Sequence, residues 1–495
     1  MTGVAEGSAQ ETEVAIVGAG PVGALLGNFL GLCGVRTVIL EREGSIYNLP
    51  RAIHFDDEIM RQLQTVGLAD EMRGRVHVSP GMLFLDANGR LLLDWSRPQT
   101  LTPQGWNASY RFHQPELERV LRDGLKRFPS VTLAPRCDVF AIDERPHGAT
   151  LGYEEIETGA LKTLKARYVV GCDGARSLVR RLIGEPMEEL GFCERWLVVD
   201  VVLKRPRPDL GDYSLQHCRP GRAATYVRGT GDRRRWEIAL ADGEDGSAAT
   251  QPARVFEHLR EWVDPEDAEL ERAAVYTFRS AVARAWRRGP LLIAGDAAHL
   301  TPPFLGQGMC AGMRDAGNLA WKLARVLAGQ SPASLLDSYG PERAPHVREY
   351  IELAVRLGGL INAKAMEAAV PRATLEGGEP VRMQSLKPRL GGLEAQAEPA
   401  GRLAPQPRLG DGTLLDARVG LRFAALMRPD FAAALGQQTR RQLEAEGVAV
   451  VAEDAPELQQ WLNSVEAVAV AVRPDRYILG AARDEAMFRS LMSAI

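Results

Sequence analysis

The sequence lacks the features that mark secreted, membrane-spanning or metal-binding proteins. Its six cysteines are scattered over 495 residues without a C-x-x-C pair, so we expect neither a redox disulfide nor a zinc cluster. No apolar run approaches the roughly 18 residues of a membrane span. The eight histidines include no H-E-x-x-H motif, and we expect no metal. The net charge of −4 does not favour nucleic acid or an anionic membrane as a partner.

The start of the chain carries no targeting signal that we can identify. Residues 1–12 include Glu6 and Glu11 and have neither a basic beginning nor an apolar core, so no signal peptide is predicted. Scattered thiols without an export signal are typical of the cytoplasm, where we expect the protein. The length allows two to four domains, and 45% hydrophobic with 25% charged residues is a globular composition.

The clearest motif present is a glycine-rich turn near the start. Gly18, Gly20 and Gly23 follow the apolar run Val14–Val17 with the spacing G-x-G-x-x-G. The first glycine permits a tight turn, the second lets the backbone approach a pyrophosphate, and the third lets helix pack on strand. The free N–H groups of the following helix would face the phosphates. The turn therefore predicts a dinucleotide site.

An acid completes this motif. Glu41 ends a second apolar run, Val38–Leu40, about 20 residues beyond the glycines, where a carboxylate accepts the ribose hydroxyls of an adenosine. FAD and NAD share that half of the molecule, so the motif does not choose between them. A glycine turn without a ligand is the structural alternative.

The rest of the chain mixes helices and strands and predicts an α/β protein with a Rossmann-like domain. Between about 190 and 280 the pattern alternates in the manner of a sheet inserted into the nucleotide domain. Residues 369–412 are rich in Pro and Gly, which is typical of a linker. We therefore predict a nucleotide domain (1–72, 102–189 and 276–368), a substrate sheet domain (73–101 and 190–275), a linker or crossing segment (369–412) and a small C-terminal α/β domain (413–495).

Two further turns suggest which nucleotide is bound. Asp173-Gly174 follows the strand Tyr168–Val170, and Gly295-Asp296 follows Leu291–Ala294 and precedes a glycine-rich helix start. With the first turn, this set resembles the FAD-dependent aromatic hydroxylases, the single-component flavoprotein monooxygenases, over roughly residues 12–360. The resemblance implies that the nucleotide is FAD. Within that family the similarity is greatest to the 3-(3-hydroxyphenyl)propionate hydroxylases, carried by PRAIHFDDE (50–58), FPSVTL (128–133), DRRRWEIAL (232–240) and VRPDRYILGAA (472–482).

The resemblance implies a role for each motif. Asp296 would accept ribitol hydroxyls, and the helix start at Gly306 to Gly308 would stabilise the negative charge of reduced flavin. Asp173, with Arg176, would lie near the pyrophosphate. Taken singly, Asp173 as a turn former and Asp296 as a helix cap are the structural alternatives. The full set of predicted cofactor contacts is Gly18, Gly20, Gly23, Glu41, Arg42, Arg51, Gln114, Asp173, Gly295, Asp296, Gly306 and Gly308.

The catalytic candidates are less well defined. Pro302 would lie near the flavin ring where oxygen reacts. His54 follows the flavin-adjacent Arg51, although the related hydroxylases tend to carry a small residue there. Further candidates come from the sheet segment, and packing or solvent exposure is the alternative for each: Tyr213 and His217 as catalytic residues, Tyr226 as a pocket or packed strand residue, and Arg219 or Arg222 as the partner of a substrate carboxylate.

The resemblance also implies the reaction. NAD(P)H would bind transiently and reduce FAD, and O₂ would then form a C4a-hydroperoxide that hydroxylates a phenolic ring in a pocket that excludes water. A tailoring hydroxylase of a polycyclic or heteroaromatic substrate is one alternative, and a flavin-binding protein without turnover is another. Residues 413–495 resemble the thioredoxin-like domain of several such enzymes. Without C-x-x-C we expect that domain to serve packing or homodimer formation.

Overall fold

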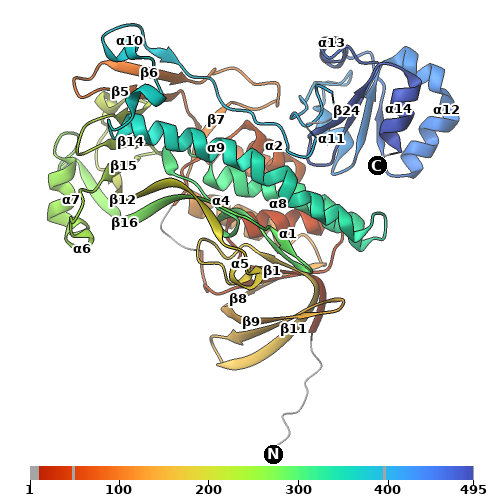
Figure 1. Ribbon diagram of the computed structural model, residues 1–495, viewed down its shortest axis with the longest axis horizontal. Coiled ribbons are helices and arrows are strands. Elements are labelled where there is room, and N and C mark those ends of the chain that lie inside the picture. Colours follow the sequence, from red (N-terminus) through yellow and green to blue (C-terminus); the bar gives the residue numbers. More distant parts are fainter. Residues whose placement is uncertain (1–9, 47–50, 394–396, 494) are drawn as a thin grey trace, which may run out of the picture.

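The computed structural model describes residues 10–46, 51–393, 397–493 and 495. The prediction that no signal peptide is present rests mostly on residues 1–9, which lie outside this part of the chain, as do parts of the predicted 1–72 segment and of the predicted linker. The described residues form four sheets (Figure 1). None of their helices is both long enough and apolar enough to cross a membrane.

A parallel sheet carries the nucleotide turn. Its strands follow the order β18 (Leu291–Ile293), β11 (Ala160–Gly171), β1 (Gln10–Val17), β2 (Thr37–Glu41) and β8 (Val131–Pro135). Antiparallel strands extend it: β17 (Arg287–Arg288) beside β18, and β10 (Gly148–Glu155) with β9 (Cys137–Arg145) beside β11. The strands β1 and β2 are buried along most of their length, as their continuous apolar runs predict for a parallel sheet.

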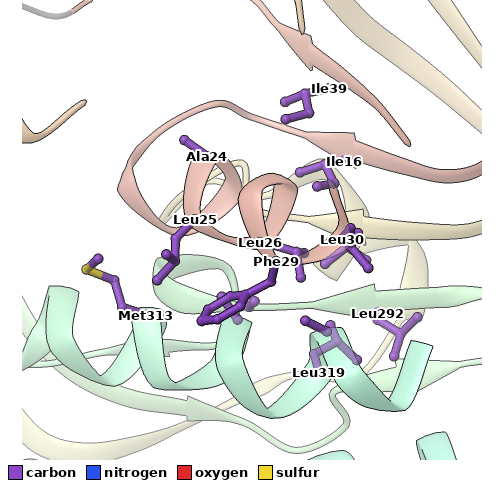
Figure 2. Packing of buried hydrophobic residues seen from close by; sticks show 14 of the residues in the cluster. Ile16, Ala24, Leu25, Leu26, Phe29, Leu30, Ile39, Leu292, Met313 and Leu319 are labelled. Atoms are coloured by element: carbon purple, nitrogen blue, oxygen red, sulfur yellow. The ribbon is translucent and has the colours of Figure 1, made fainter. Parts of the chain in front are cut away.

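Helices cover this sheet and bury its side chains. The helices α1 (Pro21–Leu32), α4 (Gln114–Leu125) and α5 (Leu178–Ile183) contact its strands, and α8 (Gly308–Leu327) packs on α1. In Figure 2, Leu25, Leu26 and Phe29 of α1 point toward Met313 and Leu319 of α8. All five side chains are at most 2% exposed. The packing joins the glycine turn, which starts α1, to the helix start at Gly308.

A nine-stranded sheet forms a second layer. Its order is β19 (His299–Leu300), β16 (Ala268–Ala283), β12 (Met187–Leu203), β15 (Arg233–Ala239), β14 (Ala224–Arg228), β13 (Ser214–His217), β5 (Gly81–Leu85), β6 (Leu91–Ser96) and β20 (Val381–Arg382). The short helices α6 (Gly246–Ala249) and α7 (Pro252–Leu259) lie on one face, where Val255 and Leu259 pack against Trp236. Two predicted domain borders, at 189/190 and 275/276, fall inside β12 and β16, because each of these long strands runs past the border.

A third sheet has three short strands. Its strands have the order β3 (His54–Asp56), β7 (Ser109–Phe112) and β4 (Val76–Val78). The helices α2 (Asp57–Thr65) and α3 (Ala69–Arg73) connect β3 to β4 in the chain. The register places His54 directly opposite Arg111. This pairing joins segments more than fifty residues apart, and the sequence pattern does not predict it.

The C-terminal part has thioredoxin-like topology. Its strands have the order β22 (Ala449–Val451), β21 (Ala424–Met427), β23 (Ala469–Val472) and β24 (Ile478–Ala482). The helix α12 (Pro429–Ala445) connects β21 to β22, α13 (Pro456–Ser464) connects β22 to β23, and α14 (Glu485–Met492) follows β24. Before these strands in the chain come the long helix α9 (Tyr339–Ile361) and the short helices α10 (Arg372–Leu375) and α11 (Leu415–Val419). Short 3₁₀ turns occur at Pro208–Leu210, Ala333–Ser338 and Met366–Ala368. The predicted linker leads to this C-terminal part, and its strand β20 pairs with β6 of the nine-stranded sheet.

Buried ion pairs join this C-terminal part to the nucleotide domain. Asp416 accepts from Arg61 Nε at 2.7 Å and from Arg476 Nε at 2.8 Å. Tyr477 donates its hydroxyl to Glu58 Oε1 at 3.0 Å. Figure 1 shows the C-terminal part in blue at one end of α8 and α9, with the nine-stranded sheet at the other. The expected α/β fold with its additional domains is confirmed.

Candidate active site

The glycine turn has the geometry that its motif predicts. Gly18 has φ of +100°, and a Cβ there would lie 2.5 Å from the Cys172 carbonyl oxygen. A Cβ on Gly23 would lie 2.0 Å from the Gly18 carbonyl oxygen. Gly20 differs, because a Cβ there would meet no protein atom within 4 Å, and this residue lines a cavity of about 560 Å³. The turn therefore needs two glycines for its own packing and one for the approach of a ligand.

Glu41 holds this turn from the end of β2. Its Oε2 accepts from the Ala19 N–H at 2.6 Å, and its Oε1 accepts from the Glu43 N–H at 2.8 Å. Each carboxylate oxygen keeps a further lone pair, so the ribose hydroxyls of an adenosine still have acceptors here. Arg42 is exposed and contacts Glu43 at 3.3 Å. Its predicted cofactor contact stays a prediction.

The loop after β18 presents Asp296 to the same cavity. Gly295 has φ of +62°, and Asp296 lies in the 3₁₀ turn Gly295–Ala297. Asp296 lines the cavity, and its carboxylate accepts no hydrogen bond from the described residues. An acid turned into a cavity with free lone pairs fits the hydroxyls of a ribitol chain. Its predicted contact with the cofactor agrees with this position better than the alternative of a helix cap.

A buried acid that the motifs did not reveal fixes that loop from behind. Asp315 Oδ2 accepts from the Gly295 N–H at 3.0 Å and lies 2.8 Å from His299 Nε2. Its Oδ1 accepts from Arg343 Nε at 2.9 Å. Burial opposes ionisation, but the charges of His299 and Arg343 hold the pKa of Asp315 below its usual value. The sequence offers no spacing that joins positions 295, 315 and 343.

The start of α8 forms another wall. Gly306 has φ of +62°, and a Cβ there would lie 3.0 Å from His54 Nδ1. Gly308 is the first residue of the 20-residue helix, and both glycines line the cavity. The positive end of a long helix stabilises a nearby anion by about 0.3–2 kcal/mol. This position suits the negative charge of a reduced flavin.

The two prolines before α8 differ in position. Pro302 is buried and does not line the cavity, whereas Pro303, which starts the 3₁₀ turn Pro303–Leu305, does. The 3₁₀ turn begins between the two prolines, so their rings point in different directions. The sequence alone does not reveal which of them lines the cavity. The structure thus favours Pro303 over Pro302 as the proline that faces bound cofactor and substrate.

Gln114 fixes the segment that carries Arg51. Its Oε1 accepts from the N–H groups of Arg51 and Ala52, at 2.9 and 2.6 Å, and its Nε2 donates to Glu118 at 2.7 Å. Gln114 and Arg51 both line the cavity, as their predicted contact with the cofactor requires.

Asp173 has a structural role in the described geometry. Its Oδ2 accepts from the N–H groups of Leu178 and Val179, at 2.7 and 3.3 Å, at the start of α5. Its Oδ1 is buried and has no partner among the described residues. Gly174 and Arg176 line the cavity, but Asp173 does not. The turn-former alternative accounts for these contacts, and a direct contact with the cofactor stays a prediction.

His54 lies inside the cavity wall, 5% exposed. Its Nδ1 is 3.2 Å from the Gly306 carbonyl oxygen and its Nε2 is 3.0 Å from Ser109 Oγ. A carbonyl only accepts, so Nδ1 carries the proton and Nε2 accepts from the Ser109 hydroxyl. Burial, reinforced by the Arg111 guanidinium, lowers the pKa of His54 to about 3. The imidazole is therefore neutral near pH 7.

The candidates from the sheet segment lie elsewhere. Neither Tyr213 nor His217 lines the cavity; Tyr213 contacts exposed Ser96, and His217 packs against Trp262. Tyr226 packs against Trp236, as its structural alternative predicts. The remaining two form ion pairs outside the cavity: Arg219 with Glu261, and Arg222 with Glu244. Alternation along β13 and β14 turns His217 and Tyr226 away from the cavity, whereas Tyr213, Arg219 and Arg222 lie in the segments that flank these strands.

Other side chains of the inner sheet face do reach the cavity. Asp200 pairs with Arg235 at 2.7 Å and with Arg272 at 2.8 Å. Arg235 Nη1 also donates to the Arg51 carbonyl oxygen at 2.7 Å, which ties the sheet to the segment beside the cofactor site. Glu237 lines the cavity, and burial raises its pKa. Arg235 and Glu237 flank Trp236 in the segment DRRRWEIAL, and Trp236 packs in the apolar cluster on the other face of the sheet. This alternation could have identified Arg235 and Glu237 as cavity residues from the sequence.

The donor set fits FAD. The open space at Gly20, the unpartnered Asp296 carboxylate and the helix start at Gly308 line the same cavity, which residues of the nine-stranded sheet also line. The described residues contain no group of three or more His, Cys, Asp or Glu that could hold a metal ion.

Comparison with known proteins agrees with this geometry. The model of the FAD binding domain family matches residues 11–354. The chain is 36% identical to a protein of Rhodococcus jostii named "Probable NADH-specific resorcinol 4-hydroxylase", over 97% of this chain and 93% of that protein. It is 34% identical to a 3-(3-hydroxy-phenyl)propionate/3-hydroxycinnamic acid hydroxylase of a Mycobacterium species, over 97% and 91% of the two chains.

Solved structures share the fold. The flavin-dependent monooxygenase PieE, in complex with FAD and substrate, superposes with a TM-score of 0.82 at 21% identity, over 98% of both chains. Aklavinone-11 hydroxylase, with FAD and aklavinone, gives a TM-score of 0.78 at 22% identity, over 98% of this chain and 99% of that one. The chain belongs to the FAD-dependent aromatic hydroxylases, and it is an FAD- and NAD(P)H-dependent monooxygenase.

Proposed function

We propose that this enzyme hydroxylates a phenol with a single aromatic ring, in the breakdown of aromatic compounds, with NADH as the electron donor and O₂ as the oxygen source. The names of both relatives above support a single-ring phenol, and the name of the Rhodococcus protein also supports NADH. Bound FAD would supply the redox chemistry by taking electrons from the nicotinamide and activating oxygen. The protein's own part is to place the ring, handle its phenolic proton and exclude water.

The observation that carries this proposal is the hydrogen-bonded pair of Ser109 and His54 in the cavity wall beside Gly306. Since the Ser109 hydroxyl donates to His54 Nε2, the lone pairs of Ser109 Oγ are free to accept from a phenol O–H. Withdrawal of that proton makes the ring more electron-rich. The low pKa of His54 opposes full protonation of the imidazole, so the pair polarises the phenol and does not store its proton.

The cavity favours one ring over several. Its volume of about 560 Å³ must take the flavin ring as well as the substrate. Apolar side chains of Met82, Trp95, Phe304 and Leu305 line it beside the His54–Ser109 pair, which suits a flat aromatic ring. The two solved structures, PieE with its substrate and aklavinone-11 hydroxylase with aklavinone, resemble this chain at 21–22% identity, which speaks for the fold alone.

We also propose a location and an assembly. All six cysteines are free thiols, which suits the cytoplasm. The thioredoxin-like domain would serve packing or a homodimer.

The test is NADH and NADPH oxidation by the FAD-loaded enzyme with a panel of phenols, with oxygen uptake and H₂O₂ recorded. We expect a single-ring phenol to stimulate NADH oxidation and to yield a hydroxylated product with little peroxide. Stimulation by polycyclic phenols alone would favour the tailoring hydroxylase. FAD binding without stimulation by any aromatic compound would favour a flavin-binding protein without turnover.

A further inference from the structure

Two arginines lie in the part of the cavity wall that also holds Ser109 and His54. Arg111 is on β7, two residues beyond Ser109, and is 7% exposed. Arg97 follows the end of β6, and its guanidinium lies over the Trp95 ring, 3.9 Å from the centroid. Both side chains line the cavity. Neither position was singled out by the sequence motifs.

These two arginines differ from the other arginines of the inner sheet face because they have no acidic partner. Arg235 and Arg272 share Asp200, and Arg279 pairs with Glu189. Among the described residues, no carboxylate forms an ion pair with Arg97 or Arg111. Arg111 Nη2 donates to Ser214 Oγ at 2.7 Å, but its buried Nε has no acceptor. The guanidinium of Arg97 donates no hydrogen bond to the described residues.

A buried cation without a counter-charge is costly for a folded protein, and buried charges are normally paired. Burial lowers the pKa of Arg97 and of Arg111 to about 10, and the charge of Arg97 contributes at Arg111. Both groups are still cationic at neutral pH. The acids whose charges act on the two arginines have other partners: Asp56 pairs with Arg314, Asp57 accepts from Thr102, and Glu237 lies 3.8 Å from Arg235. Neither guanidinium therefore has a carboxylate in contact among the described residues, and both keep unused donors that an anionic ligand would satisfy.

We propose that Arg97 and Arg111 bind a carboxylate on the aromatic substrate, so that the preferred substrate is a phenolic acid. This inference rests on the proposed function. The planar fork of a guanidinium matches a carboxylate, and the Arg111 Nε is one donor of such a fork. Ser109 and Arg111 lie two residues apart on one strand, which separates their Cα atoms by about 7 Å. One aromatic ring bridges that span, with its hydroxyl at Ser109 and its carboxylate at the arginines.

This assignment replaces Arg219 and Arg222, whose guanidinium groups are taken by Glu261 and Glu244 outside the cavity. It also separates two substrate classes that the relatives' names leave open. Resorcinol carries two hydroxyls and no carboxylate, whereas 3-(3-hydroxyphenyl)propionate carries one of each. The arginine pair favours the second class.

The experiment measures binding to the FAD-loaded enzyme without NADH, through the change in flavin absorbance. The probes are 3-(3-hydroxyphenyl)propionate, its uncharged counterpart 3-propylphenol, and resorcinol. The variants are Arg111→Met, Arg97→Met and the charge-conserving Arg111→Lys, with Arg254→Met as control because Arg254 is exposed and pairs with Glu257 on the surface. FAD content and thermal unfolding show that each variant is folded.

We expect Arg111→Met to weaken binding of the phenolic acid by about 10- to 100-fold, the value of a buried charged hydrogen bond. Arg111→Lys should recover part of this loss, and 3-propylphenol should change by less than about threefold. The inference is overturned if the wild type binds 3-propylphenol or resorcinol as tightly as the acid, or if Arg111→Met weakens all three probes equally. Failure of every phenol to stimulate NADH oxidation would instead refute the proposed function.

Discussion

Asp315 offers the sharpest test of how the protein builds its cofactor loop. The substitution Asp315→Asn keeps the side-chain shape and removes the charge. In the wild type this carboxylate is fully buried, pairs with Arg343 at 2.9 Å and holds the Gly295 N–H at 3.0 Å. Loss of one partner from a buried pair costs about 3–5 kcal/mol, because it leaves the other charge without compensation.

The matched control is Asp337→Asn. Asp337 also pairs with an arginine, Arg287 at 2.7 Å, but its side chain is 69% exposed. An exposed pair contributes about 0–1 kcal/mol, so this variant should unfold nearly like the wild type. The assay is urea unfolding of both variants with FAD bound, together with FAD affinity, because the loop carrying Asp296 depends on Asp315.

The effect should also depend on pH. The pKa of Asp315 in the folded protein lies below its ordinary value, so the unfolded chain takes up this proton first as the pH falls. Its contribution is thus fully present above the ordinary Asp pKa of about 3.9 and disappears as the pH falls through the lower folded value. A loss below about 1 kcal/mol for Asp315→Asn at pH 7, equal to that of Asp337→Asn, would refute the reasoning.

Three further predictions concern the same site. Gly20→Val should leave the fold intact, because no protein atom lies within 4 Å of the added Cβ, yet it should abolish FAD binding. Gly74→Val is equally open and should bind FAD normally. Normal FAD binding by both variants would contradict an approach of FAD at Gly20. His54→Asn should flatten the loss of stability between about pH 6.5 and 3, because burial lowers the pKa of His54 to about 3 and the unfolded chain alone takes up a proton there; an unchanged slope in acid unfolding would argue against a buried neutral imidazole. Tyr477→Phe should destabilise the protein by about 1.5–3 kcal/mol through loss of a hydrogen bond to buried Glu58, measured by urea unfolding, and a change below about 0.5 kcal/mol would show that this contact does not hold the C-terminal domain.

Much of the fold could be predicted from short contiguous stretches of the sequence. The glycine turn, Glu41 and the apolar runs around them are contiguous, and each motif fixes its own strand, turn or helix. The family resemblance then selected FAD, and the match of the FAD binding domain family to residues 11–354 confirms it. Domain borders were harder, since β12 and β16 each run across one of them.

The catalytic wall could not be predicted in the same way. His54 became informative through Ser109, its hydrogen-bond partner 55 positions away, and Arg111 lies opposite it only because β3 and β7 pair. The pairing of distant strands leaves no local signal. The candidate His217 failed to reach the cavity because β13 turns its side chain outward, and Tyr213 lies before the start of that strand. The buried acid Asp315 was missed because its partners come from three separate elements.

The most direct test of the central claim is to follow the oxygen atom. The FAD-loaded enzyme is supplied with NADH, a single-ring phenol that stimulates NADH oxidation and ¹⁸O₂, and the product is weighed by mass spectrometry. We predict one ¹⁸O atom per product molecule and about one NADH consumed for each. Recovery of the phenol without an added ¹⁸O atom, with the electrons of NADH recovered as H₂O₂, would contradict the assignment of the protein as a phenol hydroxylase.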